Sequence, residues 1–192
     1  MGLISLATVL TAWCGYQASR WGTLATRQYQ KAGATRLIGS GHAARANTLE
    51  AVDVNLFLQY VIAAEENHPA VRDFISRRFR PEMRPAFEAW LATKPLTNPN
   101  APSSPFAMPQ YRLAESALAD KMQAEAGAMF VLAQQANETG DSYVRLTVIF
   151  AAVSFLAGIC TRFPYPFHAF VVGLGFVMLL GGIIALVQQP VP

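Results

Sequence analysis

The chain has 192 residues, of which 53% are hydrophobic and only 14% are charged. Soluble globular domains carry charge on about a quarter of their residues, so this composition favours a membrane protein over an ordinary soluble domain. The net charge of +3 is spread thinly along the chain, which excludes the dense cationic face that nucleic-acid binding requires.

The first predicted element is a transmembrane helix over residues 1–20. No charged side chain precedes Arg20, and about 19 helical residues reach ~28 Å, close to the ~30 Å hydrocarbon core of a bilayer. A signal peptide is disfavoured because the stretch lacks a basic start and a small-residue cleavage pattern. A lipid-attachment site at Cys14 is rejected because Trp13 directly precedes it. We therefore expect a retained span, with a buried core helix as the alternative.

Aromatic side chains crowd the end of this first stretch. Trp and Tyr rings beside a cation are typical of the headgroup level of a membrane, so we interpret them as interface anchors in preference to a cofactor pocket. Gly15 and Ser19 form a small-xxx-small pair, a spacing that permits close approach of another helix. The anchors predicted along the whole chain are Trp13, Tyr16, Arg20, Trp21, Tyr143, Arg145, Arg162 and Tyr165.

Residues 21–142 are predicted to form an extramembrane helical domain, a stalk or hairpin inserted between the first and second spans. Their apolar residues recur at helical spacing, without convincing strand alternation. The two long helices of this domain should pack antiparallel. The expected elements are, in order, a long helix over 22–66, short helices over 69–79 and 85–93, a proline-rich loop over 94–109 at the tip farthest from the membrane, and a long helix over 110–139.

The C-terminal half of the first long helix is apolar on two faces. We expect this part to be buried on more than one side. Asp53 and Asn55 interrupt the pattern, and as buried polar groups they would need hydrogen-bonding partners. The second apolar face consists of Val54, Phe57, Leu58 and Val61.

Arginines gather around the two short helices. Such a run fits an acidic partner protein or an anionic lipid surface, and the plain alternative is a solvated face paired with nearby carboxylates. The predicted partner surface joins four of these arginines to two aromatic residues and consists of Arg77, Arg78, Arg80, Arg84, Phe87 and Trp90.

Two further spans are predicted after the middle domain. The second covers 143–161, where Arg145 lies at the edge and can snorkel outward. A short loop over 162–167 joins it to the third span over 168–188, the clearest membrane segment of the chain. The expected fold class is therefore an all-α membrane protein with three transmembrane helices. Helix-packing glycines are predicted at Gly173, Gly175, Gly181 and Gly182.

No constellation of side chains predicts catalysis. The motif GDSY at 140–143 echoes a lipase block, but it lies on a helix that enters a span. Glu65, Glu66 and His68 lie at a helix break rather than at the spacing on one helix face that metal ligands prefer. We predict no catalytic residue, no cofactor and no metal ion, and therefore a protein that is not an enzyme.

Besides this order of elements, the chain contains three characteristic stretches: TAWCGYQASRW, RRFRPEMRPAFEAWLATKPLTNPNAPSSPFAMPQYRLAE and AGICTRFPYPF. With them the chain resembles a family of uncharacterised bacterial inner-membrane proteins of the domain-of-unknown-function type. The resemblance implies a multi-pass protein of the bacterial inner (cell) membrane and transfers no activity. Because members carry extra residues before the first span, it also implies that the N-terminus is incomplete at Met1.

The expected function is that of a non-enzymatic scaffold or accessory protein, whose helical domain binds a membrane-protein partner or its own copies. The alternative is a subunit of an oligomeric channel or transporter, with the glycine-rich third span at the subunit interface. The predicted partners are thus the lipid bilayer and another protein chain, with no nucleic acid. The side of the membrane that holds residues 21–142 is left open, because long translocated domains escape the positive-inside rule.

Overall fold

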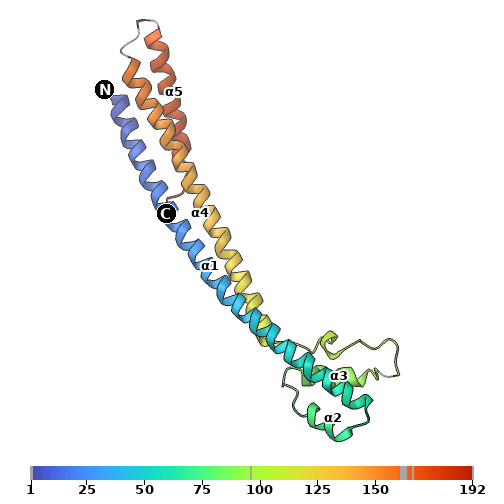
Figure 1. The fold of residues 1–192 in the computed structure, drawn as a ribbon. Helices are drawn as coiled ribbons and strands as arrows, with labels where there is room; N and C mark the ends of the chain where they lie inside the picture. Colours follow the sequence, from blue (N-terminus) through green and yellow to red (C-terminus); the bar gives the residue numbers. More distant parts are fainter. Residues whose placement is uncertain (1, 96, 161–163, 166, 192) are drawn as a thin grey trace. The chain divides into compact units, whose positions relative to one another are not determined.

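The computed structural model is all-helical, with 82% of the chain in helices. It describes residues 2–95, 97–160, 164–165 and 167–191, and no strand occurs among them. The predicted all-α class is confirmed. The elements are α1 (Gly2–Glu65), α2 (Pro69–Ser76), α3 (Arg84–Ala92), the 3₁₀ helix η1 (Pro105–Ala107), α4 (Ala114–Ile159) and α5 (Phe167–Val187), as Figure 1 shows.

The helix boundaries differ from the expected ones at several points. α1 runs without interruption through the expected join at 20–22, and α4 runs through Gly140. Neither helix contains proline, and a glycine in a helix interior costs only about 1 kcal/mol, so the glycines do not end these helices. The short helix α2 begins at Pro69, as expected, and α3 begins at Arg84, one residue before the proline that was expected to open it.

The chain divides into two compact units, each described by itself. The first, called the bundle, comprises Met1–Gly33 and Gly127–Pro192; the second, called the head, comprises Ala34–Ala126. The predicted anchor Arg162 lies outside the described residues, as do residues 163 and 166 of the expected loop 162–167.

Within the bundle, the start of α1 packs with α5 and the C-terminal part of α4. A Cβ atom added at Gly182 of α5 would lie 2.7 Å from a ring carbon of Phe150 on α4, so only glycine fits there without displacement. Gly140 similarly lies close to the backbone of α1, where an added Cβ would be 3.6 Å from the Ala18 carbonyl oxygen. The buried residues of this core are Ala7, Cys14, Tyr143, Leu146, Phe150, Val153 and Leu179.

Among the described residues, two helices are long and apolar enough to cross a membrane, α4 and α5. The first predicted span belongs to α1 and is not one of them. Its apolar residues are interspersed with polar ones, which lower the mean hydropathy of the stretch. The polar or weakly polar residues are Thr8, Thr11, Tyr16, Gln17 and Ser19.

Within the head, the C-terminal part of α1 packs with α2, α3, η1 and the start of α4. Close approach of α1 to α4 depends on small side chains, because a Cβ at Gly39 would lie 3.0 Å from that of Met122. The central core is formed by Ile75, Phe79, Met83, Phe87 and Trp90, with Leu56, Phe57, Tyr60, Phe106, Met108 and Tyr111 packed around them.

Candidate functional site

Aromatic rings hold α1 against α3 in the head. Phe57 meets Trp90 edge to face at a centroid distance of 5.2 Å, and Tyr60 meets Phe87 in the same way at 4.9 Å. Each such pair contributes about 0.5–1.5 kcal/mol beyond the area it buries. These contacts fix the C-terminal end of α1 as one wall of the site.

The proline-rich loop is ordered against the same rings. The indole N–H of Trp90 donates a hydrogen bond of 2.8 Å to the carbonyl oxygen of Pro102. The loop also turns on itself, because the amides of Thr97 and Asn98 both donate to the carbonyl oxygen of Lys94. The loop therefore forms the opposite wall, held by a buried donor that would otherwise lack a partner.

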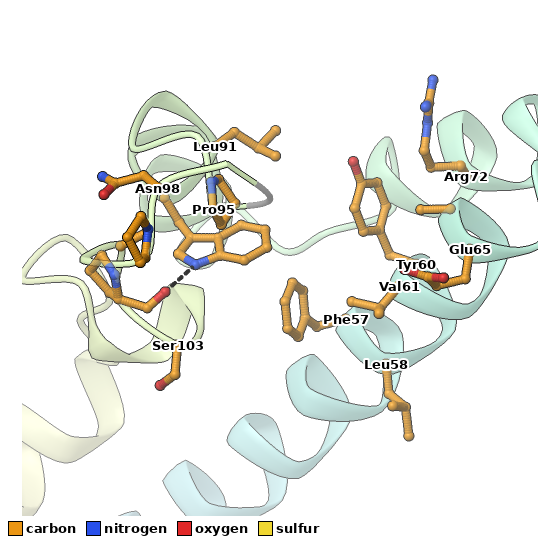
Figure 2. Close-up of a pocket in the computed structure, with 15 residues that line it drawn as sticks. Phe57, Leu58, Tyr60, Val61, Glu65, Arg72, Leu91, Pro95, Asn98 and Ser103 are labelled. Atoms are coloured by element: carbon orange, nitrogen blue, oxygen red, sulfur yellow. Dashed lines mark hydrogen bonds between the residues drawn. The ribbon is translucent and has the colours of Figure 1, made fainter.

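Between these walls lies a pocket of about 630 Å³. Figure 2 shows Phe57 and Tyr60 on the α1 side and Leu91 and Pro95 across from them, with the Trp90 hydrogen bond drawn as a dashed line. Glu65 is one of the few charged groups in the lining. A pocket with apolar walls and few polar groups fits a peptide side chain or a small apolar molecule. The sequence did not reveal it, because its walls come from segments far apart in the chain.

The outer face of α1 beside this pocket is uncovered. Val54, Leu58 and Ile62 follow one another at helical spacing and are 43%, 55% and 48% exposed. This finding corrects the expectation that the second apolar face of this helix is buried: Phe57 and Val61 are partly covered, but the rest faces solvent. We call Val54, Leu58 and Ile62 the α1 stripe.

A buried polar cluster lies on another side of α1. Asp53 is fully buried, and its Oδ2 atom accepts hydrogen bonds from Arg80 at 3.2 Å and from the Tyr111 hydroxyl at 3.0 Å. Arg80 also pairs with Glu82. The second oxygen, Oδ1, has no hydrogen-bond partner among the described residues. The cluster connects α1, the link between α2 and α3, and the segment before α4.

The electrostatics of this cluster follow from its burial. Burial raises the pKa of the Asp53 carboxyl, against the opposing effects of the Tyr111 hydrogen bond and the Arg80 charge. Burial and the neighbouring Asp53 raise the pKa of the Tyr111 hydroxyl. The sequence indicated that Asp53 needs partners but could not name them, because they lie 27 and 58 positions away. Asn55, by contrast, is exposed, which corrects the expectation that it is buried.

The predicted partner surface is divided by the fold. Phe87 and Trp90 are buried in the head core, and Arg80 is largely buried with Asp53. Phe87 and Arg80 are not available to a partner, because the core needs the ring and the buried carboxylate needs the guanidinium. Trp90 meets a partner only as part of the pocket wall. Arg77, Arg78 and Arg84 remain exposed, and their side chains donate hydrogen bonds to backbone carbonyls.

The predicted interface anchors also fall into two groups. Tyr143 is only 1% exposed, and its hydroxyl donates to the Pro190 carbonyl oxygen at 3.1 Å, which corrects its assignment as a lipid-facing anchor. Trp21 is partly buried and donates to the same oxygen at 3.2 Å. The described anchors that do face outward are Trp13, Tyr16, Arg20, Arg145 and Tyr165.

Of the predicted helix-packing residues, two on α5 are buried and the others are not in close contact. Gly175 and Gly182 are buried within the bundle. Gly173, Gly181 and Gly15 have open space where a Cβ would stand, and Ser19 is exposed.

No group of three or more His, Cys, Asp and Glu side chains suited to hold a metal ion occurs among the described residues. His42 lies against Glu115 instead, with its Nδ1 atom 2.6 Å from the carboxylate. This pair joins α1 to the start of α4 within the head. Its geometry fits a structural contact between helices. That the protein is not an enzyme stays a prediction.

Comparison with known proteins found no matching family model, curated protein or solved structure. The resemblance to uncharacterised inner-membrane proteins therefore stays a prediction.

Proposed function

We propose that this chain is a membrane-anchored adaptor, whose head binds a protein partner through the α1 stripe and the adjoining pocket. The observation that carries the proposal is the exposure of Val54, Leu58 and Ile62 in a head that already has a complete aromatic core. Three neighbouring exposed aliphatic residues beside an apolar pocket are more typical of an interaction surface than of a solvated helix face.

The proposal includes a third span formed by the start of α1. Its support is packing, because Leu3 and Leu10 pack on a core that α4 and α5 complete. The hydroxyls of Thr8 and Thr11 donate to carbonyls four residues earlier, at 2.9 and 2.8 Å, so they need no water as a partner. The bacterial inner membrane, which the resemblance implies, is part of the same proposal.

Photo-crosslinking in native membranes tests the partner surface. A photo-reactive amino acid in place of Leu58 should give a covalent adduct with another protein chain, because Leu58 lies on the stripe and lines the pocket. The same amino acid in place of Glu88, an exposed residue of α3 that does not line the pocket, is the matched control. Equal adduct formation at both positions, or none at Leu58, would refute the proposed surface.

Cysteine labelling in intact membranes tests the third span. In a background with Cys14 and Cys160 replaced by serine, Val9→Cys should resist a water-soluble maleimide until the protein is solubilised and unfolded. Arg27→Cys should react at once. Both positions are exposed on α1, so packing inside the protein cannot explain a difference between them. Rapid labelling at Val9 would remove the first span from the proposal.

A further inference from the structure

The head carries an apolar projection as well as an apolar pocket. Val71 and Phe74 of α2 are 49% and 54% exposed. The guanidinium carbon of Arg78 lies 3.4 Å from the centre of the Phe74 ring, stacked on its face. We call Val71, Phe74 and Arg78 the α2 knob. The stacking orders a flexible side chain in advance, which lowers the entropy lost when the knob binds.

The charges of the knob and of the pocket are complementary. Arg78 forms no ion pair with any described carboxylate, and its guanidinium donates a hydrogen bond to the backbone carbonyl of Phe74. Glu65 lines the pocket and likewise forms no ion pair among the described residues. Arg72, the other charged residue of the lining, is already matched by Asp73 at 3.1 Å. The pocket thus offers aromatic walls and one uncompensated negative charge.

We propose that the partner of the head is a second copy of this chain, which inserts its α2 knob into the pocket of the first and pairs its Arg78 with Glu65. This inference rests on the proposed function and specifies its partner. An aromatic ring with a stacked guanidinium suits a pocket walled by Phe57, Tyr60 and Trp90, since aromatic and arginine side chains dominate such contacts. One chain supplies both surfaces, so no other component is needed.

Charge reversal in the purified full-length chain tests this contact. The chain is reconstituted in nanodiscs or mild detergent, and its self-association is measured by native mass spectrometry and by dilution of a fluorescently labelled sample. Glu65→Arg and Arg78→Glu should each raise the dissociation constant about tenfold or more, because each puts like charges together. The double variant restores opposite charges and should return to within about threefold of the original.

Two further variants keep the test independent of folding. Phe74→Ala should weaken association although it changes no charge, whereas Glu88→Arg is the control for a reversed charge elsewhere on the head. Fluorescence of Trp90 reports whether each head is folded. Failure of the double variant to associate, with the head folded, would overturn the Glu65–Arg78 pairing.

The outcomes separate this inference from the proposed function. A purified chain that stays monomeric, while Leu58 crosslinks in membranes to a protein of different mass, overturns self-association and leaves the partner surface intact. If the protein crosslinked to Leu58 is acidic, the exposed arginines bind that protein and not a second copy of this chain. A Leu58 adduct of twice the mass of the chain, lost in Arg78→Glu, supports the contact proposed here.

Discussion

The polar cluster around Asp53 gives the sharpest prediction for the stability of the head. Tyr111→Phe removes one hydroxyl and leaves the ring, which meets Phe106 edge to face at 5.1 Å. The lost hydrogen bond is the 3.0 Å contact to Asp53 Oδ2. The change therefore isolates one polar contact without opening a cavity in the aromatic core.

The expected loss is about 2 kcal/mol in the free energy of unfolding of the head. A hydrogen bond to a charged group contributes about 1.5–3 kcal/mol, and the fully buried Asp53 keeps only its contact with Arg80 once the hydroxyl is gone. In a domain of this size, 1 kcal/mol shifts the thermal midpoint by about 4–8 °C. We expect the midpoint to fall by about 10 °C.

Intrinsic fluorescence can follow the head alone. Trp90 is buried in the head, whereas the other two tryptophans, Trp13 and Trp21, belong to the bundle and can be replaced by phenylalanine. Tyr60→Phe is the matched control. It makes the same chemical change in the same core, and the Tyr60 hydroxyl forms no hydrogen bond among the described residues. Its effect should stay within about 0.5 kcal/mol. Equal destabilisation by both variants would refute this account.

The pH dependence follows from the raised pKa of Tyr111. Its folded-state pKa exceeds the unfolded value of about 10, so the folded head holds this proton more tightly. The resulting stability is fully present below about pH 10 and is lost as the pH rises beyond it. In Tyr111→Phe, the free energy of unfolding of the head should therefore fall less between pH 8 and high pH than it does in the original chain. An equal fall of the free energy of unfolding above pH 10 in both chains would contradict this expectation.

Two further substitutions, one with a matched control, test the loop and the bundle. Trp90→Phe removes the 2.8 Å hydrogen bond to Pro102, so we expect a loss of about 1 kcal/mol and faster limited proteolysis of the adjoining loop; an unchanged cleavage rate would contradict this. Gly182→Ala places a Cβ 2.7 Å from Phe150 and should destabilise the bundle by about 1–3 kcal/mol in detergent. Gly173→Ala, which meets open space, should stay within about 0.5 kcal/mol, and a similar loss in both would refute the packing argument.

The helical class was predictable because its signals are local. Proline lacks an N–H donor and fixes φ, so Pro69 marks the start of a short helix wherever the rest of the chain lies. Glycine is a weaker signal. α4 continues through Gly140 because the close approach of α1 at that point compensates for the low helix propensity of glycine.

The site depended on contacts that the sequence does not specify. Phe87 and Trp90 lie near four arginines in the sequence, which suggested a surface. In the fold both rings are buried in the cluster that forms the centre of the head. The two apolar faces of α1 look alike in the sequence. The packing of α2, α3 and the proline-rich loop on α1 decides which face is covered and which becomes the stripe.

The start of α1 has the two unlike faces that the proposed first span requires, although its mean hydropathy is too low to mark it as a membrane helix. A hydropathy average counts every residue equally, but only the outward face of a helix meets lipid. The inward face of this stretch includes Ala7, Cys14 and the buried Gln17, whereas Leu6, Val9 and Trp13 face outward.

Beyond Arg20 the inward residues are still small, such as Ala25 and Ala32, but Arg27 and Lys31 now face outward. The packing face stays the same along this part of the helix while the outward face changes from apolar to charged. That change locates the proposed membrane boundary close to Arg20.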